Sequence, residues 1–129
     1  MPRKKKQEPR EILIEAVVSA MADKIARNPV ILDFTGLKGT ICDAFVICHG
    51  GSRTQVEAIA DHIIGQVKKK TGLNPSHKEG FENAEWILID YFDVVIHIFQ
   101  EERRNFYNIE QLWADARIIK VDTHEKTES

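Results

Sequence analysis

The turn His49-Gly50-Gly51-Ser52 carries the residues of this sequence best suited to phosphate chemistry. It follows an apolar run and precedes a helical pattern, so its backbone N–H groups could hold a phosphate. The turn lacks the lysine of a Walker motif, and it does not match the GxGxxG pattern of dinucleotide-binding loops. Phosphate binding at this turn is therefore a hypothesis without a second motif to support it.

Carboxylates that would hold Mg²⁺ beside such a turn are missing. A Gly-Ser turn of this kind occurs in nucleotidyltransferases, where the following strand carries two acids at positions i and i+2 that share one face. Here Asp61 stands at a suitable distance, but it lies in a helical pattern and no second acid accompanies it. Asp90 and Asp93 flank a hairpin turn, with no lysine or third acid nearby in sequence. We predict that the chain is not an enzyme and holds no cofactor.

The thiols and imidazoles do not predict a metal centre. Neither cysteine belongs to a CxxC pair, and no histidine belongs to an HxxxH pair, which are typical spacings of zinc ligands. Nucleophilic catalysis by Cys48 would need an activating base that the sequence does not reveal. With only two cysteines, Cys42 and Cys48, the chain has no disulfide framework, and we expect reduced thiols, at least one of them in a buried strand.

Periodicity predicts the elements that position these residues. Apolar residues at helical spacing predict a helix over residues 10–27, followed by short strands over 30–34 and 44–48. Ser52 and Gln55 form a capping-box pattern that starts a second helix, and Gly72 suits its left-handed C-terminal cap. Residues 74–83 are polar and irregular, with room for a short edge strand.

Residues 85–90 and 93–99 predict a β-hairpin across Tyr91-Phe92. With those two residues as the loop, Ile89 pairs with Val94, and Ile87 pairs with Ile96. One face of the hairpin then carries only aliphatic residues, namely Ile87, Ile89, Val94, Ile96 and Ile98. The other face mixes aromatic, acidic and imidazole side chains, namely Trp86, Leu88, Asp90, Asp93, Val95, His97 and Phe99. Such a mixture is typical of a surface that recognises a partner.

A short helical segment over residues 101–113 follows the hairpin, and we expect it to turn Phe106, Ile109, Leu112 and Trp113 inward. An alternative to an open recognition surface is that this segment covers Trp86. His97 has an alternative as well, because a histidine on a sheet is more often a hydrogen-bonded structural residue than a ligand. The pattern predicts a single α/β domain over residues 9–116, with a mixed sheet and flanking helices, between tails at 1–8 and 117–129.

Charge is distributed unevenly along the chain although the net charge is only -2. Residues 1–10 carry five basic residues against one acid, whereas residues 79–115 carry nine acids against two arginines, a net charge of -7. A surface that acidic repels phosphate and suits a basic protein partner. The basic tail is a candidate for a contact with RNA, with a solvated arm as the alternative. The chain shows no apolar run of membrane-spanning length and no signal sequence, so a cytoplasmic location is expected.

An ordered series of motifs over residues 12–115 resembles the ribosomal silencing factor family, also called Iojap-related. The series comprises Asp43-Ala44-Phe45-Val46-Ile47, Gly51-Ser52 with Gln55, Ala58-Ile59-Ala60, Glu79-Gly80, Trp86-Ile87-Leu88-Ile89-Asp90, Asp93-Val94-Val95-Ile96-His97-Ile98-Phe99, Arg104, Phe106-Tyr107-Asn108-Ile109-Glu110 and Leu112-Trp113. Phe92 departs from the pattern, because the family usually has glycine in this turn, so the turn type is open.

The resemblance implies a nucleotidyltransferase-like α/β topology without catalytic acids. It also implies a translational repressor that binds the large ribosomal subunit at ribosomal protein fourteen and blocks joining of the small subunit. A role in assembly of the large subunit at the same site is the alternative, and some family members form homodimers. Trp86 is the expected anchor of the partner-binding surface, which also includes Leu88, Phe99, His97, Tyr107, Asp90, Asp93 and Glu79.

Overall fold

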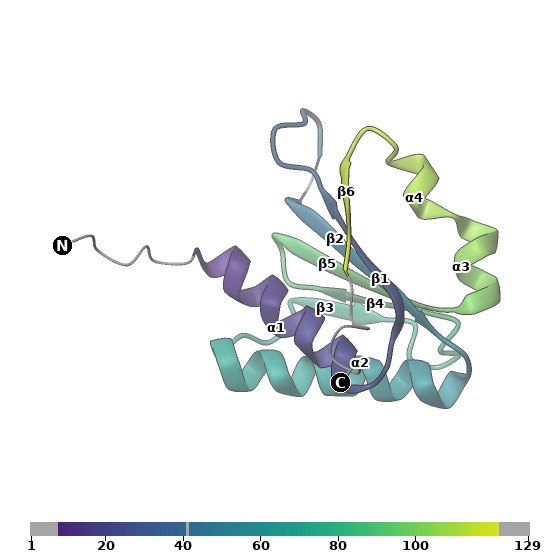
Figure 1. Ribbon diagram of the computed structural model, residues 1–129. Helices are drawn as coiled ribbons and strands as arrows, with labels where there is room; N and C mark the ends of the chain where they lie inside the picture. Colours follow the sequence, from purple (N-terminus) through teal and green to yellow (C-terminus); the bar gives the residue numbers. More distant parts are fainter. Residues whose placement is uncertain (1–7, 41, 122–129) are drawn as a thin grey trace, which may run out of the picture.

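The sheet and two long helices make up most of the computed structural model, which describes residues 8–40 and 42–121 (Figure 1). Six strands lie in the order β3-β4-β5-β2-β1-β6. Their bounds are β1 Arg27–Asp33, β2 Ala44–Gly50, β3 His77–Glu79, β4 Trp86–Asp90, β5 Val94–Gln100 and β6 Arg117–Lys120. The β2 and β5 strands are parallel, whereas the other neighbouring pairs are antiparallel. The predicted α/β class, with a mixed sheet and flanking helices, is confirmed.

Helices α1 (Pro9–Asp23) and α2 (Arg53–Thr71) cover one face of the sheet (Figure 1). The aliphatic residues of the hairpin lie beneath them in the larger core cluster, as the alternation predicted. Helix α2 begins where its cap predicts, because Ser52 Oγ accepts a hydrogen bond of 3.1 Å from the Gln55 amide. It ends at Gly72, which adopts the left-handed conformation with φ of 80°.

Helix α1 ends four residues earlier than the apolar pattern predicted. The backbone N–H groups of Ile25 and Ala26 bond to the carbonyls of Ala22 and Met21, which is the Schellman arrangement of a helix terminus. Ile25 takes the left-handed position with φ of 58°, and its side chain is 75% exposed. Ala26, the next residue, is buried. Buried apolar residues therefore continue beyond the end of α1, and for this reason the pattern predicted a longer helix.

The turn of the hairpin of β4 and β5 lies at Phe92-Asp93, one residue later than predicted, so the expected pairing is wrong by two residues. Ile89 pairs with Ile96 and Ile87 pairs with Ile98, while Tyr91 N–H bonds to the Val94 carbonyl. A shift of two positions keeps every side chain on its original face, because side chains alternate with a period of two. The predicted division of the hairpin into an aliphatic face and a mixed face therefore survives the error in register.

Strand β6 corrects the predicted domain boundary. Residues 117–120, placed in the C-terminal tail, pair with β1 from Asp33↔Arg117 to Val30↔Lys120. The pattern missed this strand because it is a sheet edge of four residues, and three of them are exposed to solvent. Residues 122–129 of the predicted tail lie outside the described residues, as do residues 1–7 of the N-terminal tail.

Tyr91 places a phenol hydroxyl in the larger core without a hydrogen-bond partner among the described residues. Its side chain is 6% exposed, and burial raises the pKa of the phenol to about 12. We expect Tyr91→Phe to raise the free energy of unfolding by about 1 kcal/mol, because the variant removes a buried polar group and keeps the ring. Urea unfolding of the two proteins measures this difference, and a less stable variant would show that the hydroxyl has a partner.

Candidate functional site

The glycine turn that could have held a phosphate is closed by the chain's own side chains. Gln55 Oε1 accepts a hydrogen bond of 2.7 Å from the Gly51 N–H, a donor that a phosphate would use. The Arg27 guanidinium lies against Gly51, where an added Cβ would stand 3.0 Å from Arg27 Nη2. Asp61 lies exposed on α2, away from the open face of the sheet. The turn thus works as a helix cap, and these contacts argue against phosphate binding.

The thiol that covalent catalysis would need is Cys48, which is fully buried in the helix-side core. Burial raises the pKa of this thiol to about 12, so it stays protonated near neutral pH. The candidate zinc ligands do not converge either. Within residues 8–40 and 42–121, no three His, Cys, Asp or Glu side chains lie close enough to hold a metal ion.

Trp86 lies on the open face of the sheet, opposite α1 and α2, in a stack of aromatic rings. Its indole N–H donates a hydrogen bond of 3.0 Å to His97 Nδ1, and its ring stacks on Phe99 with centroids 5.0 Å apart. Tyr107 also packs on the indole, with ring centroids 4.7 Å apart, and lies 6.4 Å from the ring of Phe99. These contacts fix the orientation of the indole, while the residue as a whole stays half-buried rather than sealed by the following helices.

Two residues of the predicted binding set do not present their own atoms at this surface. Phe99 is 0% exposed and His97 is 4% exposed, because Trp86 and Tyr107 cover Phe99 while Phe45 packs on His97 at 4.4 Å. This burial argues against a direct contact of either side chain with a partner. Both residues lie beneath Trp86 and support it. The alternation of side chains along a strand predicts which face of the sheet a residue is on, but it does not predict whether other side chains cover that residue.

A hollow of about 180 Å³ lies beside the indole and is lined by Glu79, Gly80, Trp86 and Leu88. The edge strands create it, because β3 pairs Glu79 with Leu88 and so places both on the face of Trp86. Gly80 has a φ of 90° and approaches the Trp86 carbonyl so closely that a Cβ would clash with it. Three of the predicted binding residues thus surround one cavity that can receive a side chain of a partner.

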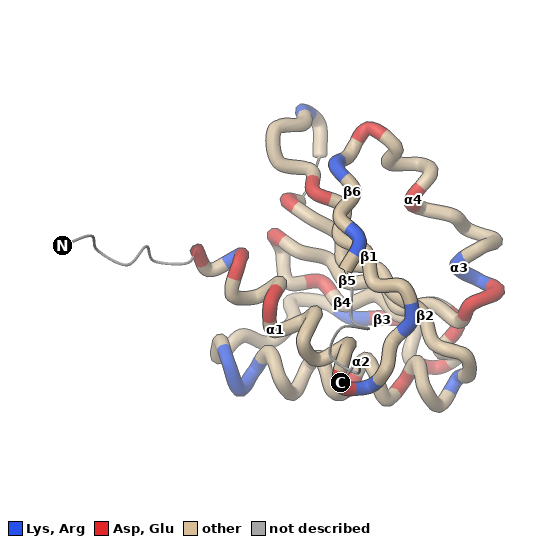
Figure 2. The backbone as a smooth tube through the Cα atoms, in the orientation of Figure 1, with Lys and Arg blue, Asp and Glu red and all other residues tan. Residues whose placement is uncertain are grey.

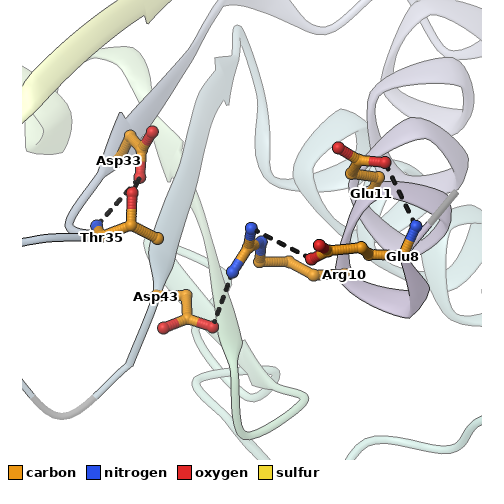
Figure 3. Close-up of polar contacts among 6 residues, drawn as sticks. All are labelled: Glu8, Arg10, Glu11, Asp33, Thr35 and Asp43. Carbon is orange, nitrogen blue, oxygen red and sulfur yellow. Dashed lines mark hydrogen bonds and ion pairs between the residues drawn. The ribbon is translucent and has the colours of Figure 1, made fainter.

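Carboxylates gather where β4 ends and where β2 and β5 begin (Figure 2). Asp43 already has a partner, since Arg10 Nη1 reaches it from α1 at 3.2 Å (Figure 3). Asp90 Oδ1 accepts a hydrogen bond of 2.7 Å from the Phe92 N–H and so caps the hairpin turn, in which Phe92 has a φ of 73°. Several acids of the -7 segment form no ion pair with any described residue, namely Glu82, Asp90, Asp93, Glu102 and Asp115. They are available to a basic partner.

Helices α3 (Glu101–Tyr107) and α4 (Ile109–Leu112) pack against one end of the open face through a buried arginine (Figure 1). Arg104 donates to the Asn28 carbonyl at 2.9 Å, to His49 Nδ1 at 2.8 Å and to both oxygens of Glu110 at 3.1 Å. Burial and the Arg104 charge lower the pKa of His49, in agreement with a neutral imidazole that accepts this hydrogen bond. The sequence suggested Arg104 only as a family motif residue, because its partners lie up to 77 residues away.

The inward packing predicted for residues 101–113 is only partly correct. Ile109 is buried, but Phe106 is 73% exposed and Leu112 is 74% exposed, whereas Trp113 packs on Phe34 at 5.1 Å. Asn108 takes the left-handed conformation with φ of 46° between the two helices, so α4 does not continue the apolar stripe of α3. The prediction treated residues 101–113 as one helical segment, and it therefore placed Phe106 and Leu112 on the wrong side.

The pH dependence of stability tests the burial of a neutral His97, the acceptor of the Trp86 indole N–H. Burial lowers the pKa of His97 from its ordinary value of 6.5 to about 4, so between these values the unfolded chain binds a proton that the native state does not. The free energy of unfolding should therefore fall by about 1 kcal/mol between pH 7 and pH 5.5. Urea unfolding at both pH values measures it. His97→Gln keeps an acceptor for the indole and should reduce the slope, and an unchanged slope would contradict the assignment.

The fold and this surface define a class of protein: an α/β domain with a closed phosphate turn and an open, acidic and aromatic sheet face. No helix of the described ranges has the length and apolar character needed to cross a bilayer. The family model described as ribosomal silencing factor during starvation matches residues 6–129. This chain belongs to the ribosomal silencing factor family, as its motifs indicated.

Relatives and a solved structure agree with this membership. The chain is 42% identical to ribosomal silencing factor RsfS of Halalkalibacterium halodurans and 39% identical to that of Bacillus subtilis, in each case over 85% of this chain and 92% of the relative. A chloroplastic Iojap protein of Arabidopsis thaliana is 32% identical over 65% of this chain and 34% of its own length. A crystal structure from Chromobacterium violaceum superposes with a TM-score of 0.76 at 30% identity, covering 84% of this chain and 88% of that one.

Proposed function

We propose that this protein represses translation by binding the large ribosomal subunit at ribosomal protein fourteen and by blocking the small subunit from joining. One observation carries the proposal: Trp86 is held by its bond to His97 beside a hollow, and the nearby Asp90 and Asp93 form no ion pair with any described residue. Half-buried, pre-oriented tryptophans are frequent anchors of protein interfaces. The block would be steric, since a domain of 14.8 kDa would occupy space between the subunits.

Charge supports a basic protein as the partner. The -7 segment contains the last residue of β3 and all of β4, β5, α3 and α4, which form or flank the open face. Ribosomal proteins are commonly basic, and complementary charge speeds encounter and fixes orientation. In this proposal Trp86 and Leu88 contact apolar groups of the partner, Tyr107 extends the contact, and Glu79, Asp90 and Asp93 face its basic groups.

Co-sedimentation with ribosomal subunits tests the proposal. The purified protein is mixed with isolated large subunits, small subunits are then added, and a sucrose gradient separates free subunits from joined ribosomes. We expect the protein to sediment with large subunits and to reduce the fraction of joined ribosomes. Full joining with the protein still bound would contradict the steric block, and binding only to immature large subunits would favour the alternative role in assembly.

Salt should weaken the complex through the acidic residues. We expect the Kd to rise about tenfold between 0.1 and 0.5 M NaCl, because ions screen exposed charge pairs. The double variant Asp90→Asn and Asp93→Asn should reduce this dependence, while Asp61→Asn on the opposite layer serves as the matched control. A complex that is indifferent to salt would indicate a purely apolar interface instead.

The remaining parts of the proposal concern activity, RNA, self-association and location. Purified protein should turn over neither ATP nor GTP with Mg²⁺, and measurable turnover would favour a nucleotidyltransferase.

The proposal also includes a contact of the basic N-terminal tail with ribosomal RNA, although residues 1–7 lie outside the described residues. We also propose that the protein forms a homodimer, which analytical ultracentrifugation of the protein alone tests. We further propose that it is located in the cytoplasm, which cell fractionation tests.

A further inference from the structure

Four large apolar side chains stand in solvent on the eight residues 106–113. Phe106 is 73% exposed, Leu112 is 74% exposed, Tyr107 is 41% exposed and Trp113 is 36% exposed. We call these four residues the α3–α4 ridge. Single exposed apolar residues are ordinary on protein surfaces, but a concentration of this kind indicates an interaction site. Among these four residues, only Tyr107 is needed to pack against Trp86. The packing of the Trp86 surface therefore does not explain why Phe106, Leu112 and Trp113 are exposed.

The ridge is continuous with the surface around Trp86. The rings of Phe106 and Tyr107 meet edge to face at 5.1 Å, and Tyr107 in turn lies 4.7 Å from the indole of Trp86. On the other side, Trp113 contacts Phe45, whose ring lies 4.4 Å from that of His97. An unbroken chain of aromatic contacts therefore runs from β4 onto α3, and one partner can span both parts.

The structure also holds the ridge in its exposed position. Arg104, two residues before Phe106, is tied to the sheet by its hydrogen bonds to the Asn28 carbonyl and to His49. Ile109 is 7% exposed and fills the space beneath the ridge. Because Ile109 already occupies the interior and Arg104 fixes the orientation of α3, Phe106 cannot turn inward without breaking both contacts. An interface formed by the ridge would lose little backbone conformational entropy on binding.

Charge around the ridge identifies its occupant. Residues 101–115 carry four acids against two arginines, and Arg104 is buried against Glu110. Glu102 and Asp115 pair with no residue that the structure describes. A second copy of this chain would bring the same net negative charge to the interface, whereas a basic protein would complement it. We propose that the α3–α4 ridge is a second contact for the basic large-subunit protein that the Trp86 surface binds, an inference that rests on the proposed function.

Serine substitutions at the ridge test this inference by co-sedimentation with large subunits. Phe106→Ser and Leu112→Ser should each raise the Kd about tenfold, the loss expected when a side chain that contributes strongly to an interface is removed. Ile25→Ser is the matched control, because Ile25 is 75% exposed but lies between α1 and β1, on the helix side. Since these side chains are mostly in solvent, thermal unfolding should show folded variants. A photoreactive phenylalanine analogue at position 106 retains the ring and should cross-link to a basic ribosomal protein.

Each outcome separates this inference from the proposed function. If Trp86→Ala weakens binding while Phe106→Ser and Leu112→Ser bind normally and no cross-link forms, the ridge contact is overturned and the Trp86 surface stands. If the ridge variants bind normally but turn a dimer into a monomer in the ultracentrifuge, the ridge belongs to self-association instead. If the unmodified protein does not sediment with large subunits, both proposals fall together.

Discussion

Replacing Trp86 with alanine should weaken binding to the large ribosomal subunit about thirtyfold, equivalent to about 2 kcal/mol. The indole contributes the largest side chain beside the hollow formed with Glu79 and Leu88. Its bond to His97 and its stack on Phe99 orient it before binding, so little entropy is lost when a partner covers it. Co-sedimentation over a range of subunit concentrations measures the Kd of the variant and of the parent protein.

Trp86→Phe separates the indole's contact with a partner from its structural role. This variant keeps an aromatic ring over Phe99 but loses the hydrogen bond to His97 Nδ1, so we expect only part of the thirtyfold loss. Circular dichroism must show that both variants remain folded. A Trp86→Ala protein that is unfolded would assign the tryptophan to the core, and a folded variant with unchanged affinity would remove the anchor from the proposed surface.

Replacing Arg104 with alanine should lower the free energy of unfolding by about 3 kcal/mol, as expected when one partner of a buried ion pair is removed. The side chain of Arg104 is 9% exposed, and its loss would leave Glu110, His49 and the Asn28 carbonyl without their donor. These are the contacts that attach α3 to the sheet. Urea unfolding followed by tryptophan fluorescence measures the effect and also reports on the surroundings of Trp86 and Trp113.

Arg103→Ala is the matched control for this prediction, because it removes the same kind of side chain from the same helix. Arg103 pairs with Glu85 at 3.4 Å, but the two side chains are 43% and 47% exposed, so solvent screens the pair. We expect a change below about 0.5 kcal/mol. Equal destabilisation by the two variants would mean that the buried network around Arg104 contributes no more than a surface ion pair.

Local patterns predicted the parts of the fold that depend on neighbours in sequence. The cap formed by Ser52 and Gln55 and the left-handed Gly72 involve residues within one helical turn of each helix end, so their types alone predict α2. The faces of the hairpin survived a pairing error of two residues, because alternation along a strand has a period of two. The ordered motifs likewise predicted the family without any coordinates.

Exposure was the property that the sequence did not predict, because it depends on what packs over each residue. Phe99 and Trp86 share one face and pair directly, yet Phe99 is fully covered while Trp86 is half-buried. Phe106 follows the pattern of an inward residue but is exposed, since Arg104 and Asn108 set the direction of α3 and α4.

The sequence alone determined the fold class, the mixed character of one hairpin face and the family, since all three are carried by short-range spacing. The tertiary structure decided which of those side chains reach solvent, where β6 lies and how the glycine turn is closed. Gln55 reaches the carbonyl of Ile25, and Arg104 reaches that of Asn28, across 30 and 76 residues of chain. Contacts over such separations form only when the strands pair and the helices pack, and no local pattern of residues records them.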